Sequence, residues 1–190
     1  MHNVIRTAGS HKQTLKNTVE RRRSKDEHEE MNVQDLKIEK AITEILSSQL
    51  LAVLATERDG QPYSSLMAFA NTADLRTVIV ATGTATRKYM NLLKEARVSL
   101  LVDNRSNSSS DFHSAAAVTV IGRAEPVGQE ERSQYEGIYL KKHPYLETFL
   151  QSPTTSLFKI SACHYLIVNR FQNVMEYHLS NETDIFAAGM

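Results

Sequence analysis

The feature that most constrains the fold is a series of short aliphatic and β-branched runs between residues 50 and 179, separated by turn-forming residues. Runs of this kind are typical of β-strands, and the glycine, asparagine and aspartate between them favour turns. We expect strands at Leu50–Thr56, Pro62–Asn71, Thr77–Thr82, Val98–Val102, Ala116–Ala124, Ser156–Ser161, Tyr165–Val168 and Val174–Leu179. The first run is apolar on both faces, which favours a buried strand, although periodicity alone does not exclude a helix there.

The connections between the runs indicate how the strands pair. Asp59-Gly60 is a strong hairpin signal between the first two runs. Gly122 lies within the fifth run and indicates a β-bulge or a close backbone approach. Most connections are short, which favours antiparallel pairing over a doubly wound sheet. The expected fold is therefore mainly β with inserted helices, a closed or split antiparallel β-barrel built from six to seven of these strands.

Four segments carry helical spacing instead. Apolar residues recur every three or four positions from Leu36 to Leu46, with Asn32 as a plausible N-cap and Asp35 in the first turn. Short helices are expected near 86–96 and 145–150, and a longer one over 130–142 that ends before Pro144. Residues 104–110 are rich in serine and asparagine and are expected to form a loop.

The first 31 residues differ in composition from the rest of the chain. In residues 1–30 the sizeable aliphatic residues are Val4, Ile5, Leu15 and Val19, among many charged ones. Such a segment buries too little surface to offset its ordering entropy, so we expect a disordered polar tail over 1–31 and one domain over 32–190. Two alternatives remain open: Met31 is the true start, or the segment becomes helical against a partner subunit.

Charge and cysteine content exclude several classes of protein. The 22 Lys and Arg residues balance 22 Asp and Glu residues, so no overall field recruits nucleic acid or an acidic membrane surface. Cys163 is the single cysteine, which excludes an internal disulfide and fits a reducing compartment. No apolar run is long enough to span a bilayer, and the N-terminus lacks the apolar core of a signal peptide. We expect a soluble cytoplasmic protein.

Residues 80–92 carry the clearest chemical signal. A strand ends, Gly83 lets the backbone turn, threonines cluster, and Arg87-Lys88 opens a helix. The first amides of a helix lack intrahelical partners, so these amides, the helix dipole and the two cations together make a phosphate site. The alternative is that Arg87 and Lys88 form only the solvated face of a short helix.

The order of these segments closely resembles the FMN-binding split barrels related to pyridoxamine 5′-phosphate oxidase. The resemblance is carried by Gly60–Tyr63, Ser65–Phe69, Ala81-Thr82 before Thr86–Lys88, Ala96–Leu101 and Val120–Glu125, and it covers about residues 45–127 well. It implies a homodimer with FMN at the subunit interface. By resemblance, Ser65, Leu66 and Met67 border the flavin ring, Ala81 and Thr82 contact the flavin, and Arg87 and Lys88 bind its phosphate. No catalytic residue and no metal site is implied.

The departures from the family pattern also carry information. Pyridoxamine-phosphate oxidases have a basic residue where Ser65 stands, a lysine where Ala70 stands and a glutamine near Ala117. Their C-terminal arginine and histidine, which clasp the substrate phosphate, have no counterpart in residues 169–173. The resemblance therefore implies an FMN-binding, flavin-dependent oxidoreductase with an unidentified small-molecule redox substrate, and it argues against true pyridoxamine-phosphate oxidase activity.

Several alternatives stay open at this point. The protein could bind flavin or haem without turnover, or use the deazaflavin F420 as a reductase cofactor. A haem ligand would have to come from His113, His143, His164 or His178. No two of these histidines have the spacing of a metal-binding pair. The alternative is that each is a structural histidine, at the surface or partly buried. Cys163 is either a redox thiol or a packing residue, and Phe171 and Tyr177 either stack on a partner's flavin or belong to the core.

Overall fold

The computed structural model describes residues 33–169 and 173–179. Contacts divide the chain into two units, Met1–Lys37 and Ile38–Met190. Described residues of the first unit, 33–37, are helical, and helical residues continue to 48. The tail expected over 1–31, the cap expected at Asn32, and Phe171 lie outside the described residues. None of the described helices is long and apolar enough to cross a lipid bilayer.

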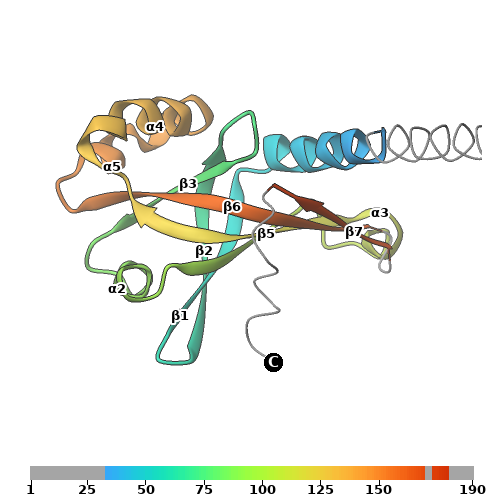
Figure 1. Ribbon diagram of the computed structural model, residues 1–190, viewed down its shortest axis with the longest axis horizontal. Coiled ribbons are helices and arrows are strands. Elements are labelled where there is room, and N and C mark those ends of the chain that lie inside the picture. Colours follow the sequence, from blue (N-terminus) through green and yellow to red (C-terminus); the bar gives the residue numbers. More distant parts are fainter. Residues whose placement is uncertain (1–32, 170–172, 180–190) are drawn as a thin grey trace, which may run out of the picture. The chain divides into compact units, whose positions relative to one another are not determined.

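Seven strands in the described chain form one antiparallel sheet in the order β3-β2-β1-β4-β5-β6-β7 (Figure 1). Their bounds are β1 Leu51–Arg58, β2 Gln61–Asn71, β3 Thr77–Gly83, β4 Arg97–Asp103, β5 Ala116–Pro126, β6 Thr155–Asn169 and β7 Asn173–His178. Because β3 also pairs with β6, strands β1 to β6 close into a barrel, and β7 extends the sheet beyond β6. The expected antiparallel barrel is confirmed.

Helices interrupt the strand order at three places. They are α2 Arg87–Lys94, α3 Asp111–Ser114, α4 Gln129–Lys142 and α5 Glu147–Gln151, with a 3-10 turn at Pro144–Leu146 before α5. The helices expected near 86–96, 130–142 and 145–150 are thus present within a few residues. The short helix α3, which follows the serine-rich loop, was not predicted.

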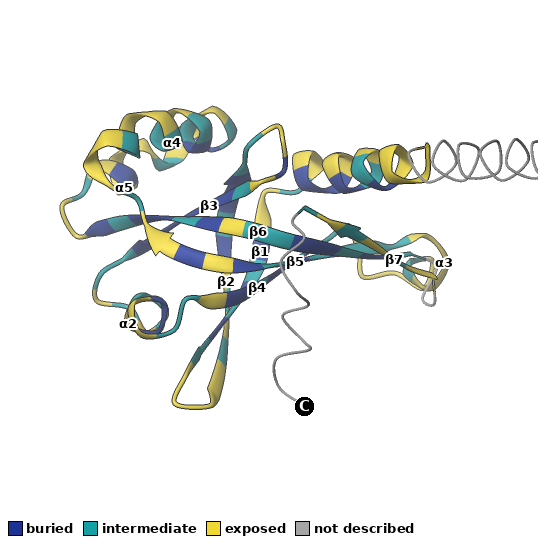
Figure 2. Ribbon diagram, viewed as in Figure 1, coloured by how far each residue is buried: buried dark blue, intermediate teal, exposed yellow. Residues whose placement is uncertain are grey.

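Side chains from alternate strand positions fill the barrel, and Figure 2 shows the buried residues running along the strands. The main core includes Leu54, Phe69, Val80, Leu100 and Ile160, together with Ile42 and Leu46 of the helical segment. A second cluster lies under α4 and α5 and contains Ala70, Ile79, Ala81, Tyr139, Leu150 and Leu157. Strand β3 is therefore buried on both faces, which explains its continuous apolar sequence.

The hairpin and glycine signals are confirmed. Arg58 pairs with Gln61 across a tight turn in which Asp59 and Gly60 both have positive φ, 55° and 79°. Gly122 lies at a shift in the β5–β6 register, and a Cβ atom there would sit 2.4 Å from the carbonyl oxygen of Ser161. The close backbone approach therefore occurs at Gly122, opposite a bulge in β6.

The C-terminal strands differ from the expectation. The runs Ser156–Ser161 and Tyr165–Val168 belong to one strand, β6, which continues through the residues between them. The register pairs Ile121 with His164 and Gly122 with Ala162, so Cys163 is the extra residue of a bulge. A bulge lets the strand bend without ending, which is why no turn residue was needed.

Strand β1 also differs from the expectation of burial on both faces. Ala52 and Leu54 point into the barrel and are 2% and 0% exposed, whereas Leu51 is 51% exposed. One face of this strand therefore packs in the core, and the other forms part of an apolar outer surface.

Candidate functional site

The loop before α2 is fixed by threonine hydroxyl groups. Thr86 has an extended backbone and caps α2, because its Oγ1 accepts a hydrogen bond from the Tyr89 amide at 3.3 Å. The same hydroxyl lies 2.9 Å from the Thr82 hydroxyl and donates to the Gly83 carbonyl at 2.8 Å. Strand β3 and the start of α2 are thereby joined in one hydrogen-bonded unit.

The first turn of α2 is suited to an anion. The cap satisfies the Tyr89 amide, while the amides of Arg87 and Lys88 have no hydrogen-bond partner among the described residues. No acidic side chain lies in this first turn. Free amides, the positive end of the helix dipole and two basic side chains are the groups that bind phosphate in proteins.

A cavity of about 320 Å³ lies between α2 and the β1–β2 hairpin. It is lined by Arg58, Asp59, Gln61, Tyr63, Arg87 and Asn91. The Arg87 guanidinium lies 5.4 Å from the centroid of the Tyr63 ring. Lys88, which follows Arg87 on the helix, does not line this cavity.

Two contacts hold α2 against the hairpin beside this cavity. The buried Asn91 side chain donates to Thr56 Oγ1 at 3.0 Å, and Lys94 forms an ion pair with Asp59. The hydrogen bond and charge of Lys94 hold the pKa of Asp59 below its usual value. These contacts fix one wall of the cavity. The charged groups that line it are the cations of Arg58 and Arg87 and the carboxylate of Asp59, which is already paired with Lys94.

The β2 residues expected to border a flavin ring face different ways. Ser65 Oγ is buried and has no hydrogen-bond partner among the described residues. Leu66 is 65% exposed on the outer face, whereas Met67 is 7% exposed and packs in the barrel core. Met67 could therefore border a ligand only through its backbone.

The two β3 residues expected to contact the flavin, Ala81 and Thr82, lie in different surroundings. The Thr82 hydroxyl belongs to the bonded unit at the start of α2. Ala81 is buried in the cluster under α4. In this segment β3 pairs with β6, with Ala81 opposite Leu157 and Thr82 opposite Ser156.

The predicted site residues flank the place where the barrel splits. The β2–β3 ladder extends only from Phe69↔Val80 to Asn71↔Val78. Residues 65–67 of β2 and residues 81–82 of β3 lie just beyond its last pair, and α2 follows directly. The structure thus places five of the seven predicted residues on the two sides of one opening, and Arg87 and Lys88 on the helix that follows it.

The histidines take different roles. His143 Nε2 lies 2.7 Å from the Phe69 carbonyl oxygen, so the buried ring donates to the backbone of β2. His164 and His178 are cross-strand neighbours on β6 and β7 with ring centroids 4.6 Å apart. Sequence spacing missed this pair, because only the β6–β7 register brings the two residues together. The described residues contain no cluster of three groups that could hold a metal ion.

Tyr177 packs against the main core, and its hydroxyl donates to Glu39 Oε2 at 3.3 Å. Cys163 is partly buried at the β6 bulge. For Tyr177 the structure agrees with the packing interpretation.

Comparison with solved structures gives the fold. A heme-binding protein from Mycobacterium smegmatis superposes with a TM-score of 0.64 at 18% identity, over 70% of this chain and 55% of that one. A putative pyridoxamine 5′-phosphate oxidase from Listeria innocua superposes with a TM-score of 0.55 at 22% identity, over 70% of this chain and 98% of that one. An FAD-binding protein from Mesorhizobium loti superposes with a TM-score of 0.54 at 18% identity, over 66% of this chain and 89% of that one. The chain thus spans little more than half of the mycobacterial protein.

Sequence comparison gives the family. No protein of curated function matches the chain. The sequence profile described as pyridoxamine 5′-phosphate oxidase matches residues 38–166, a segment that contains the barrel from before β1 into β6 and the start of α2. This chain therefore belongs to the pyridoxamine 5′-phosphate oxidase family.

Proposed function

We propose that this protein binds FMN at the opening between β2 and β3 and acts as a flavin-dependent oxidoreductase on a small-molecule substrate. The observation that carries the proposal is the coincidence of three features. The β2–β3 ladder ends, and α2, whose first turn is suited to bind an anion, begins after β3. The residues indicated by the family resemblance lie beside the end of the ladder and at the start of α2. A strand edge without a partner strand offers backbone groups to a ligand.

The residues present fit a phosphate-bearing flavin. Arg87 can offer a forked pair of donors to a phosphate, Lys88 a point charge, and their amides two further donors. Ser65 Oγ is a buried polar atom that lacks a partner among the described residues, and a ligand atom beside β2 would satisfy it. A bound flavin would supply hydride and electron transfer, while these residues bind and orient it.

The outer face of the sheet supports a homodimer that covers the flavin. Cross-strand pairing places Leu66, Val53 and Leu101 in one row on β2, β1 and β4, beside Leu51. Leu66 and Leu51 are 65% and 51% exposed. A contiguous exposed apolar face is typical of an interaction surface, and we propose that a second copy of the chain covers it.

True pyridoxamine-phosphate oxidase activity is not part of the proposal. Ala70, which stands where those enzymes have a lysine, is 1% exposed in the cluster with Tyr139 of α4. Helix α4 therefore covers the position from which that lysine would reach a substrate. The substrate of this protein must be held by other groups.

The visible spectrum of the purified protein tests the cofactor directly. Oxidised flavin, deazaflavin and haem absorb in different regions, so the proposal predicts a flavin spectrum and release of FMN on denaturation. A haem or deazaflavin spectrum, or no uptake of added FMN, would contradict it. Bleaching of the flavin band by a reduced nicotinamide would show electron transfer, whereas a flavin that no donor reduces would indicate a binding protein without turnover.

A further inference from the structure

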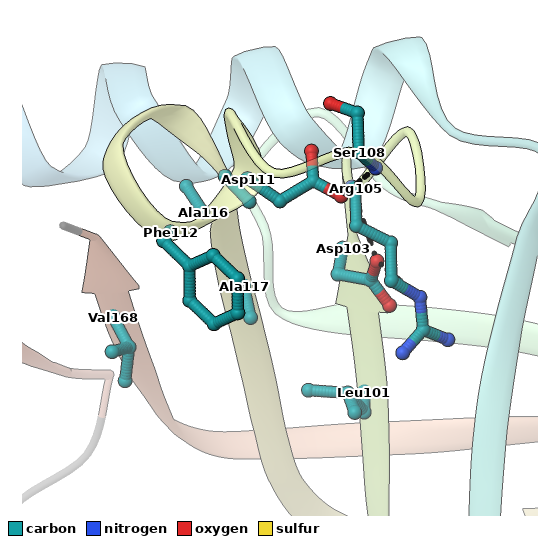
Figure 3. Close-up of a pocket in the computed structure, with 10 residues that line it drawn as sticks. Leu101, Asp103, Arg105, Ser108, Asp111, Phe112, Ala116, Ala117 and Val168 are labelled. Carbon is teal, nitrogen blue, oxygen red and sulfur yellow. Dashed lines mark hydrogen bonds and ion pairs between the residues drawn. The ribbon is translucent and has the colours of Figure 1, made fainter. Parts of the chain in front are cut away.

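A hollow of about 420 Å³ lies on the sheet beside α3, where Leu101, Phe112 and Ala117 are among the residues that line it (Figure 3). Cross-strand pairing places Leu101 beside Val53, in the apolar row that the proposed dimer covers. The hollow therefore belongs to that surface. A reactive group lies elsewhere, at the C-terminal end of α4, where Lys142 is the last helical residue.

The Lys142 amine is held between the helical segment before β1 and strand β2. Its Nζ donates to the Leu46 carbonyl oxygen at 2.7 Å and lies 3.6 Å from the centroid of the Phe69 ring. The next residue, His143, has its Nε2 2.7 Å from the Phe69 carbonyl oxygen, so α4 and β2 are joined beside the amine. The Lys142 side chain remains partly exposed, which suits a small reagent rather than a large one.

The positive charge of Lys142 has no counter-ion within the described residues. Lys94 and Lys159 are paired with carboxylates, whereas the hydrogen-bond partner of Lys142 Nζ is the neutral carbonyl of Leu46. A partly buried cation without a carboxylate beside it is costly. Burial accordingly lowers the pKa of Lys142 from its usual 10.5 to about 8. A larger share of this amine is therefore neutral near neutral pH than is usual for lysine.

The contacts of Nζ suit a neutral nitrogen. A neutral amine can donate one N–H to Leu46 and still keep a lone pair, which makes it a nucleophile. An acylated lysine also keeps one N–H, so it can retain the hydrogen bond to Leu46 without a charge that the surroundings leave uncompensated. The site thus favours both the reactive form of the amine and the neutral product of its acylation.

We propose that Lys142 is a site of Nε-acylation by small acyl phosphates. The Nζ lone pair attacks the carbonyl carbon of the acyl phosphate and a C–N bond forms. The C–O bond to phosphate breaks, inorganic phosphate leaves with the bonding electrons, and one Nζ proton passes to phosphate or water. The proposal goes beyond the proposed flavin function, because none of the seven residues assigned to the flavin takes part.

Incubation of the folded protein with acetyl phosphate, followed by tandem mass spectrometry, tests the site. Lys141 is the matched control, because it is the adjacent lysine and is exposed. At a pH of about 8 we expect acetylation of Lys142 to be about tenfold faster than that of Lys141. The rate at Lys142 should rise by no more than about twofold at higher pH, because about half of the amine is already neutral. The preference should vanish in guanidinium chloride, which unfolds the chain.

Three results would overturn the proposal. They are acetylation of Lys142 no faster than that of Lys141, a rate at Lys142 that rises about tenfold or more above a pH of about 8, and a preference that persists in the unfolded chain.

Incorporation of Nε-acetyllysine gives an independent test. If the surroundings accommodate the neutral amide, the chain with acetyllysine in place of Lys142 should have a denaturation midpoint at least as high as the chain with acetyllysine in place of Lys141. A lower midpoint for the modification at Lys142 would show that the folded protein rejects the acyl group, and the proposal would be wrong.

Discussion

At Gly122 the backbone of β5 passes so close to β6 that no side chain fits between them. A Cβ atom would lie 2.4 Å from the Ser161 carbonyl oxygen and 2.9 Å from Ile160 Cγ2. The neighbouring atoms belong to a paired strand and to the core, so they cannot move away cheaply. This residue therefore controls how closely two barrel strands approach.

Gly122→Ala should lower the free energy of unfolding by about 1–3 kcal/mol, the usual cost of overpacking. Denaturant titration measures the loss. Gly137→Ala is the control, because that glycine lies within α4, where an added methyl group would meet nothing within 4 Å, and alanine there should raise stability by about 0.5–1 kcal/mol. Equal stability of Gly122→Ala and the wild type would show that the strands can separate.

Single residues also show how far the site could be predicted. The helix expected to open at Arg87 is present, and the structure adds that Thr86 caps it, a role that depends on local sequence. The orientation of Met67 follows from two-residue alternation with Phe69, which faces the core. The contact between His164 and His178 depends on strand register, which single-sequence spacing does not contain.

At the level of elements, β6 shows why strand boundaries were predicted less well than strand existence. Its inward residues are Phe158 and Ile160 before the bulge and Tyr165 and Ile167 after it, so the two-residue alternation shifts by one at Cys163. A shift of this kind, with no turn residue beside it, indicates a bulge within one strand. Without that criterion the segment is split into two strands.

Helix α4 contacts the helical segment before β1 through Lys142. Its Nζ donates to the Leu46 carbonyl at 2.7 Å and lies 3.6 Å from the centroid of the Phe69 ring. Burial lowers the pKa of Lys142 from its usual 10.5 to about 8. The side chain thus caps one helix from another at a cost in desolvation of its charge.

This arrangement predicts a pH dependence. Between about pH 8 and 10.5 the unfolded chain binds the Lys142 proton more tightly than the folded chain, so this residue makes the free energy of unfolding rise with pH. Denaturant titrations at pH 7.5 and pH 10 should give the free energy of unfolding of the wild type and of Lys142→Met. The wild type should gain stability relative to the variant between pH 7.5 and pH 10. Lys141→Met, at an exposed position, is the control. A difference that stays constant would mean that burial leaves the pKa unshifted.

For the whole molecule, the proposed dimer places the outer sheet face between two copies of the chain. The face that carries Leu51, Val53 and Leu66 is apolar although it lies outside the barrel. The antiparallel barrel class could be predicted from the sequence, because hairpin signals and strand runs are local. Which face of β1 lies inside the barrel could not be predicted, since both faces of this strand are apolar in the sequence.

We predict a homodimer in light scattering of the wild type. Leu51→Glu places a charge on the outer face and should shift the protein toward monomer, because burying an unpaired carboxylate is costly. Leu36→Glu is the control, since Leu36 is 58% exposed on a helical segment and belongs to no strand of the sheet. A monomeric wild type that still retains flavin would contradict the dimer.

The most direct test of the proposed site is whether Arg87 recognises a phosphate. Arg87→Ala removes a charge-assisted pair, so FMN should bind about ten- to a hundredfold more weakly, while riboflavin, which lacks the phosphate, should bind almost unchanged. Arg76→Ala, at the other end of β3, is the matched control and should bind both ligands like the wild type. FMN affinity unchanged in Arg87→Ala, or equal losses for FMN and riboflavin, would contradict a phosphate site at the start of α2.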